Sequence, residues 1–394
     1  MKKKYICLFI LLFYALSLTI FTLVRVYQIK ESMTTKRIIE EKEEEKIVID
    51  NQIFEYNTDV YLKKIINEET NIKIDTLTLG DNTINYNNYV VNYKIVDTQK
   101  PLISGSSTIT VEKGKEVNIV NKFMCGDNYD DNPNCYIEGG FDFNKTGTYD
   151  LKYVATDTSG NTSSKNFKLK VVDKKPASTS KKVTKVKLSE YIKKYKNENT
   201  MIGIDVSAWQ DNIDYKKAKK DGVEFVIIRI GYGHTSKGTI VEDKWYKNNI
   251  EKAKKEGLPV GLYFYSYAKS EEEAREQARW IVSKLNGTKL ELPIAFDWEN
   301  WSSFNKYKVS FKHLNDICYA FIDEVEKNGY QGSLYSSAFY LNRIWKQPEN
   351  TWLAYYTDNN DFSKPYNIWQ VSSTGKVDGI SGAVDVDILY KQKN

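Results

Sequence analysis

The stretch Ile294-Ala295-Phe296-Asp297-Trp298-Glu299 places three apolar residues directly before two acids, as at the end of a buried β-strand. Similar apolar runs recur from Met201 onward, and amphipathic segments with helix-capping signals separate several of them. The eight runs are 202–206, 225–230, 260–265, 294–296, 334–335, 352–356, 368–371 and 384–388. Alternation of strands and helices predicts a parallel sheet, open or closed, and eight strands favour an α/β barrel.

Two helices of this region carry clear signals. Ser270 and Glu273 have the spacing of a capping box. A later helix has an apolar stripe that includes Cys318, and it is expected to end at Gly329. Cys318 is therefore expected to be a core residue rather than a nucleophile.

Four acids are associated with strands of the predicted barrel: Asp205, Asp297, Glu299 and Asp385. The carboxyl ends of barrel strands form the active site in this architecture. Asp297 and Glu299 are two residues apart, so in an extended backbone they share one face, with Cα atoms about 6.6–6.8 Å apart. For any one acid the alternative is a capped turn or a surface ion pair.

Paired carboxylates suit the cleavage of an acetal, because one acid protonates the leaving oxygen while a second carboxylate stabilises the cationic centre. His234 and His313 are the only histidines of the 394 residues, which leaves little room for a serine or cysteine triad or a multi-histidine metal site. Aromatic side chains near the acids are candidates for stacking on sugar rings: Trp209, Tyr263, Tyr265, Tyr335, Tyr356 and Trp369.

Residues 202–390 closely resemble the family 25 glycoside hydrolases, the muramidase-type lysozymes. The matching stretches are Gly203-Ile204-Asp205-Val206-Ser207-x-Trp209-Gln210, Phe225–Arg229, Gly261–Tyr267, Asp297-x-Glu299, Tyr335-Ser336, Trp352-Leu353-Ala354-x-Tyr356, Trp369-Gln370-x-Ser372-Ser373-x-Gly375 and Val384-Asp385. The resemblance implies an irregular barrel in which not every strand is followed by a helix. It implies as substrate the β-1,4 bond from N-acetylmuramic acid to N-acetylglucosamine in peptidoglycan.

The resemblance also implies roles for the acids. Glu299 would be the general acid/base, and Asp297 would orient or stabilise the substrate's N-acetyl group during substrate-assisted cleavage. Asp205 and Asp385 would position these groups and tune their pKa values. Gln370 joins the aromatic residues as a substrate-binding candidate, and neither a metal nor an organic cofactor is needed.

Two positions depart from the family pattern. Many members have a histidine where Phe264 stands and an asparagine where Asp387 stands. Neither is one of the four acids, so both departures bear on subsite preference more than on activity.

The N-terminus predicts a membrane anchor over residues 1–30. Three lysines precede an apolar run from Tyr5 to Val24, and twenty helical residues span roughly 30 Å, the thickness of a bilayer core. The alternative is a cleaved signal peptide, although the run is longer than the usual 7–15-residue apolar core. The lysines would stay in the cytoplasm, which predicts a single-pass plasma-membrane protein with an extracellular catalytic domain.

Four segments connect the predicted anchor to the catalytic domain, which is expected over residues 197–394. Residues 31–46 read as a charged stalk, 47–96 as a small β-rich module, 97–173 as an immunoglobulin-like β-sandwich and 174–196 as a lysine-rich linker. The sandwich segment resembles bacterial immunoglobulin-like repeats through Gly147-Thr148-Tyr149 and the later Asp157-x-x-Gly160-Asn161. Its Cys125 and Cys135 are expected to form a disulfide rather than two free thiols.

The same segment contains four aspartates, Asp127, Asp130, Asp131 and Asp157. They could bind calcium, but acids that cap turns are the commoner explanation.

The linker contains nine lysines and one glutamate, so the chain's small net charge of +5 is local and gives no argument for nucleic acid. It could act as a plain tether or attract anionic wall polymers. The sequence as a whole predicts a membrane-anchored, extracellular peptidoglycan hydrolase. The alternatives are a wall-binding protein with an inactive barrel and a different glycosidase acting on the same polymer.

Overall fold

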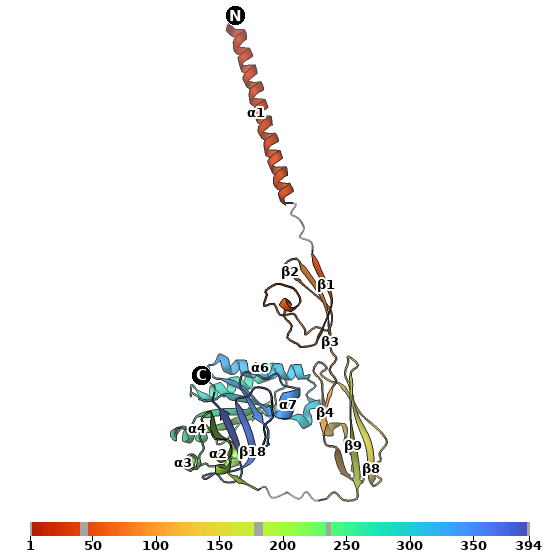
Figure 1. Ribbon diagram of the computed structural model, residues 1–394, viewed down its shortest axis with the longest axis vertical. Coiled ribbons are helices and arrows are strands. Elements are labelled where there is room, and N and C mark those ends of the chain that lie inside the picture. The colour runs from red at the N-terminus through yellow and green to blue at the C-terminus, as the bar shows by residue number, and fades with distance from the viewer. Residues whose placement is uncertain (1, 40–45, 177–183, 234–237, 392–394) are drawn as a thin grey trace. The chain divides into compact units, whose positions relative to one another are not determined.

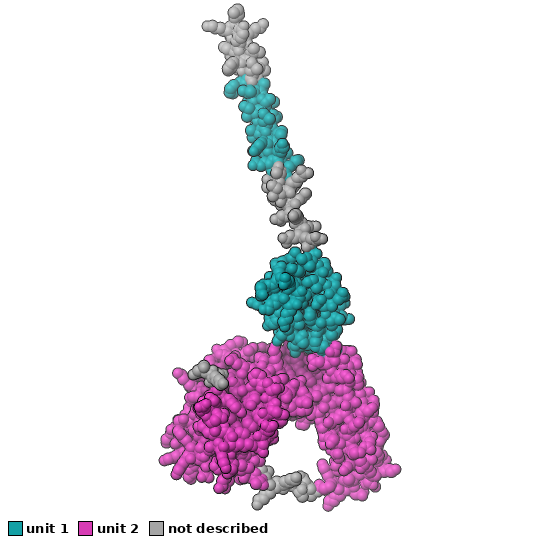
Figure 2. Space-filling view, viewed as in Figure 1, with its two compact units in different colours: residues 1–97 teal, residues 98–394 magenta. Residues whose placement is uncertain are grey.

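The computed structural model describes residues 2–39, 46–176, 184–233 and 238–391, with residues 2–12 and 34–39 as backbone only. The chain forms two compact units, residues 1–97 and 98–394 (Figure 2).

The first unit begins with helix α1 (Lys2–Ile39), which contains the apolar run predicted as an anchor. Among the described residues, no helix has both the length and the apolar character required to cross a bilayer. The anchor therefore stays a prediction. Residues 40–45 of the predicted stalk lie outside the described part of the chain.

A three-stranded sheet follows, with β1 (Ile47–Glu55) parallel to β3 (Tyr89–Val96) and β2 (Gly80–Tyr86) antiparallel to β3. Two local sequence patterns differ from this sheet. Residues 71–74 alternate polar and apolar side chains as a strand does, but they make only an isolated bridge from Lys73 to Tyr61, although Ile74 is buried. Gly80-Asp81-Asn82 has a composition typical of a turn, but it begins β2. The segment 60–66 forms a 3₁₀ turn, η1 (Leu62–Lys64).

The second unit begins with residues 98–173, called here the β module. One sheet has the order β5 (Thr108–Glu112), β9 (Thr162–Val172), β8 (Gly147–Thr156) and β7 (Asn134–Glu138). The other pairs β4 (Leu102–Gly105) with β6 (Phe123–Gly126). Phe123 of β6 packs on Tyr153 and Phe167, so the two sheets share one core. Val117-Asn118-Ile119 has the alternation of a strand but forms none, and a 3₁₀ turn, η2 (Val120–Lys122), follows it.

A disulfide between Cys125 of β6 and Cys135 of β7 joins the two sheets of the β module. Asp127 accepts hydrogen bonds from the backbone of Tyr129 and Asp130, and Asp157 accepts from Asn161. These are turn-capping contacts.

The remainder of the second unit is a closed eight-stranded barrel (Figure 1). All eight expected strands are present: β11 (Thr200–Val206), β12 (Phe225–Gly233), β14 (Val260–Tyr265), β15 (Ile294–Asp297), β16 (Gly332–Ser337), β17 (Thr351–Ala354), β18 (Ile368–Lys376) and β19 (Val384–Tyr390). The first seven are parallel to one another. The last, β19, is antiparallel to both β18 and β11 and closes the ring. A short strand, β13 (Ile240–Glu242), pairs with β12 outside the ring.

Helices follow only the first five barrel strands among the described residues. They are α3 (Tyr215–Asp221), α4 (Tyr246–Lys255), α5 (Glu271–Leu285), α6 (Phe311–Lys327) and α7 (Ala338–Arg343). The capping box of α5 is only half formed, because Ser270 accepts from the Glu273 N–H while the Glu273 carboxylate accepts from Lys269. Cys318 is buried in α6.

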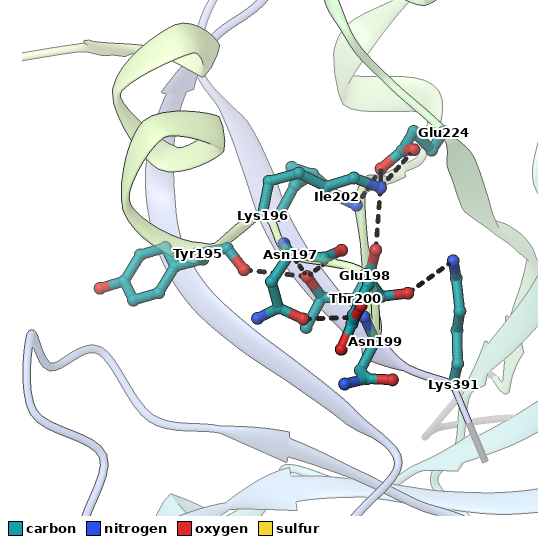
Figure 3. A network of polar contacts seen from close by, with 9 residues as sticks. All are labelled: Tyr195, Lys196, Asn197, Glu198, Asn199, Thr200, Ile202, Glu224 and Lys391. Carbon is teal, nitrogen blue, oxygen red and sulfur yellow. Dashed lines mark hydrogen bonds and ion pairs between the residues drawn. The ribbon is translucent and has the colours of Figure 1, made fainter. Parts of the chain in front are cut away.

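The C-terminal part of the predicted linker belongs to the barrel. Strand β10 (Val186–Lys187) pairs with β18, and helix α2 (Leu188–Tyr195) buries Leu188 and Tyr191 in the barrel core. A polar network then fastens the chain where β11 begins (Figure 3). In this network the Lys196 ammonium donates to the Glu224 carboxylate, which also accepts a hydrogen bond from the Ile202 N–H. The tether thus ends about ten residues earlier than its composition suggests.

Candidate active site

The four predicted acids meet at one end of the barrel. Asp297 is the last residue of β15, and Glu299 follows it. Asp385 lies near the start of β19, but because this strand runs antiparallel to β11 it stands directly opposite Asp205. Besides burial, the charge of Asp385 raises the pKa of both Asp205 and Glu299. The pair Asp205 and Asp385 is therefore an electrostatic neighbour of the pair Asp297 and Glu299.

Asp297 is buried, with only 3% of its surface exposed. Its Oδ1 atom accepts no hydrogen bond from the described residues. Burial raises the pKa of Asp297 well above its ordinary value and the Glu299 charge raises it further, while Arg229 opposes the shift. A buried oxygen without a donor is costly, so this atom is suited to receive an N–H group from a ligand.

Glu299 lies two residues further on, on the same side as Asp297. Trp298 between them is fully buried on the other side, where its indole N–H donates to the Ala268 carbonyl. Glu299 is exposed. The protein around its carboxyl nevertheless displaces enough water to raise its pKa, and the charge of Asp385 adds to this effect. A solvent-accessible carboxyl with a raised pKa can deliver a proton to a ligand.

Asp205 is held by a buried hydrogen-bond network. The Gln370 amide donates to Asp205 Oδ2 over 2.7 Å. The hydroxyls of Tyr335 and Tyr356 donate to the amide oxygen of Gln370 over 2.9 and 2.7 Å. These contacts fix the orientation of the Gln370 side chain, and through it that of Asp205.

Asp387 is a fifth acid of the site, which the sequence singled out only as a departure from the family pattern. It is fully buried, and the Trp352 indole donates to its Oδ1 over 2.9 Å. Its Oδ2 atom is also buried and accepts no hydrogen bond from the described residues. The negative charge of Asp387 helps to raise the pKa of Asp205, so the two carboxyl groups are electrostatic neighbours. Burial raises the pKa of both, with further contributions from Asp385.

The predicted substrate-binding residues divide by exposure. Trp209 is 82% and Tyr356 57% exposed. Tyr263 and Tyr265 are half-buried, while Tyr335 and Gln370 are buried in the network described above. Trp209 is presented by a one-turn helix, η3 (Ala208–Gln210), whose cap is formed by reciprocal hydrogen bonds of Ser207 and Gln210.

Trp369 does not lie where a sugar-stacking residue should. Successive side chains of a strand point to opposite faces, and because Gln370 points into the barrel, Trp369 points out of it. Its buried indole donates to the Tyr355 carbonyl and packs edge-on against Tyr195 of α2. The same alternation places Phe264 on the outer side, against Trp280, so it does not line the site.

An open pocket of about 820 Å³ includes a charged pair that the sequence did not identify. Tyr265, which lines this pocket, is an electrostatic neighbour of Asp297 and Glu299. Trp209, Tyr265 and Tyr267 line the pocket together with Arg229 and Asp243. The Arg229 guanidinium contacts the buried Asp243 carboxylate at 2.8 Å. A single charged residue within the apolar run 225–230 was the available signal. His234, beyond this strand, lies outside the described residues.

A closed barrel with a carboxylate pair at one end is compatible with glycoside hydrolysis. Residues 204–380 match the family model of glycosyl hydrolases family 25.

Three similar proteins illustrate the match. The uncharacterized protein YegX of Escherichia coli K12 is 28% identical over 198 residues, which cover 48% of this chain and 70% of YegX. The autolytic lysozyme of Clostridium acetobutylicum is 27% identical over 191 residues, covering 48% of this chain and 55% of the relative. The structure of the autolysin LytC of Streptococcus pneumoniae with a synthetic peptidoglycan ligand has 27% identity and a TM-score of 0.44, covering 61% of this chain and 56% of LytC.

Proposed function

We propose that this chain is a muramidase that cleaves the β-1,4 bond from N-acetylmuramic acid to N-acetylglucosamine in peptidoglycan. The observation that carries the proposal is the pair Asp297 and Glu299, in which a buried carboxylate oxygen lacks a donor and an exposed carboxyl has a raised pKa. The naming of two relatives as lysozymes, one from Clostridium acetobutylicum and one from Streptomyces globisporus, supports the substrate.

In the proposed mechanism Glu299 is the general acid. Its raised pKa keeps it protonated to higher pH than an ordinary glutamate, so it can protonate the glycosidic oxygen as the bond breaks. The resulting carboxylate then removes a proton from the incoming water.

Asp297 would orient the substrate. Its Oδ1 atom, which accepts no hydrogen bond from the described residues, would accept the N–H of the 2-acetamido group. The acetamido oxygen would then be directed at the anomeric carbon, where it stabilises the developing cation. Asp205 and Asp385 would hold and tune this pair, and Trp209 and Tyr356 would offer exposed aromatic faces to sugar rings.

The location and the non-substrate partners are also proposed. The N-terminal helix would anchor the chain in the plasma membrane with the catalytic domain outside, and the lysine-rich segment after residue 173 would approach anionic wall polymers. Protease added to wall-stripped cells should then digest everything beyond about residue 30 and leave the N-terminal lysines protected. A product released into the medium that starts near residue 30 would instead indicate a cleaved signal peptide.

The substrate is tested by digesting purified peptidoglycan and identifying the new reducing ends by mass spectrometry. A muramidase exposes N-acetylmuramic acid at the reducing end. N-acetylglucosamine there would indicate a different glycosidase, and a chain that sediments with walls but releases no reducing ends would be a binding protein.

A further inference from the structure

The β module contacts the barrel next to the catalytic pair. A 3₁₀ helix, η4 (Trp301–Lys306), begins two residues after Glu299. The Cys125 N–H of β6 donates to the Asn305 side chain of η4 over 2.8 Å. Gly126 faces the rings of Phe304 and Phe311 so closely that an added Cβ would lie 2.4 and 2.6 Å from their atoms. The contact leaves no space for a side chain at this glycine.

The β module also caps the helix that follows η4. The first N–H groups of a helix have no partner within the helix. In α6 the Phe311 N–H donates to the Asp127 carbonyl over 2.7 Å and the Lys312 N–H to the Asn128 carbonyl over 3.3 Å. The Ser310 N–H donates to the Asp131 carboxylate over 2.7 Å. Asp131 also places negative charge at the positive end of the helix dipole.

Aromatic packing connects this contact to the catalytic residues. The Phe304 ring lies 6.0 Å from that of Trp298, and the Trp301 ring lies 4.8 Å from it. Trp298 is fully buried and stands between Asp297 and Glu299 in the sequence. A shift of η4 would therefore move the backbone that carries both carboxyl groups.

We propose that the β module is a positioning element of the active site, in which β6 and the following loop hold η4 and the start of α6 so that Glu299 and Asp297 keep their productive geometry. The proposal assigns the module a role beyond that of a spacer, and its effect on hydrolysis rests on the proposed function. Gly126, Asn305 and Asp131 are then positioning residues, and substitutions there should lower turnover more than substitutions at exposed residues of the module. A misplacement of about 1 Å in a catalytic group can cost on the order of 10²-fold in rate.

The test compares two glycines of the β module in the full chain. Gly126→Val inserts a side chain into the contact with Phe304 and Phe311. Gly140→Val is the matched control, because no atom lies within 4 Å of a Cβ built there and its backbone is not in the left-handed region. We expect Gly126→Val to lower kcat on peptidoglycan by about 10–100-fold and to change the pH profile of kcat, while Gly140→Val matches the wild type.

Asn305→Ala provides a milder second variant in case Gly126→Val does not fold. It removes the acceptor of the Cys125 N–H and should lower kcat by a smaller factor, again with a changed pH profile, at temperatures well below its melting point. If a folded Gly126→Val or Asn305→Ala variant has the kcat and pH profile of Gly140→Val, the proposal is wrong.

Amide hydrogen exchange separates this proposal from the proposed function. Exchange at the backbone of residues 298–307 should accelerate in Gly126→Val and Asn305→Ala but not in Gly140→Val, whether or not the wild type hydrolyses peptidoglycan. Unchanged exchange in both variants would overturn the positioning role. A wild type that releases no reducing ends would overturn only the proposed function.

Discussion

The two carboxyl pairs of the site differ in how the protein treats them. Asp205 accepts a hydrogen bond from Gln370 and Asp387 accepts one from Trp352, although Asp387 Oδ2 has no hydrogen-bond partner among the described residues. At Asp297 and Glu299, burial and neighbouring charge alone account for the raised pKa values, and Asp297 Oδ1 accepts no hydrogen bond from the described residues.

The difference indicates a division of labour. Carboxyl groups that accept hydrogen bonds from protein side chains are held in place and keep their orientation when substrate arrives. Asp297 Oδ1, beside the exposed Glu299, is available to the substrate and to the transition state. The first pair should therefore govern stability and its pH dependence, and the second should govern turnover.

The largest effect is expected for Glu299→Gln. The amide keeps the shape of the side chain but cannot supply a proton, so the rate of wall hydrolysis should fall by about 10²–10⁴-fold with the melting temperature nearly unchanged. Glu349→Gln is the control, because Glu349 is exposed beside the opposite ends of the barrel strands. A wild-type rate of reducing-end release by Glu299→Gln would show that another group is the acid.

Asp297→Asn should reduce turnover by a comparable factor, roughly 10²-fold or more. An amide at this position offers less negative charge to the acetamido N–H and to the developing cation. Binding to insoluble peptidoglycan, measured by co-sedimentation, should be retained because the aromatic faces are unchanged. Loss of binding together with loss of folding would assign Asp297 a structural role instead.

Asp387→Asn should act on stability rather than turnover. A buried acid with a raised pKa binds its proton more tightly in the folded state, so its contribution to stability falls as pH rises from the unfolded value, near 4, through the folded value. The asparagine removes this loss while its oxygen still accepts from Trp352. The melting temperature of the variant relative to wild type should thus increase between pH 4 and pH 8, by about 2–4 °C for each kcal/mol gained.

The exposed Asp378 provides a control for this experiment, since Asp378→Asn should leave the pH dependence of the melting temperature unchanged. Melting curves of Asp387→Asn that run parallel to those of the wild type across this pH range would contradict a raised pKa at Asp387.

The smallest effect is expected for Trp209→Ala. The indole is 82% exposed and lines the pocket beside the acids. Its loss should raise KM by roughly 2- to 10-fold, the equivalent of about 0.5–1.5 kcal/mol for an aromatic contact, with kcat little changed. Trp369→Phe should leave KM unchanged, because Trp369 faces away from the site. A KM effect at Trp369 and none at Trp209 would reverse the assignment.

The barrel could be predicted because buried strands require apolar runs in the sequence. The meeting of the four acids could be predicted because each acid stands in or directly after such a run. Whether each side chain points into or out of the barrel was harder to predict. Trp369 was expected in the site, but the inward direction of Gln370, which depends on tertiary hydrogen bonds to Asp205, turns it outward. The proximity of Asp387 to Asp205 depends on the antiparallel register of β19, which the run 384–388 does not encode.

Composition misled the sequence analysis at α2. Nine lysines between residues 174 and 196 suggest a tether, yet Leu188, Tyr191, Ile192 and Tyr195 have helical spacing and pack on the barrel. Similarly, nothing local to Gly126 or Asn305 indicates that the β module touches the catalytic loop, because that contact joins residues 180 positions apart.

The central claim is that Glu299 supplies the proton and that Asp297 acts on the acetamido group. It is tested most directly by comparing Glu299→Gln and Asp297→Asn on substrates with different leaving groups. Release of nitrophenolate from a nitrophenyl glycoside of N-acetylmuramic acid needs no protonation, whereas cleavage of the natural sugar–sugar bond does. The account predicts that Glu299→Gln releases nitrophenolate within about 10-fold of the wild-type rate while losing about 10²-fold or more on peptidoglycan, and that Asp297→Asn is slow on both. Equal losses of Glu299→Gln on both substrates, or a normal rate of Asp297→Asn on the nitrophenyl glycoside, would contradict the assigned roles.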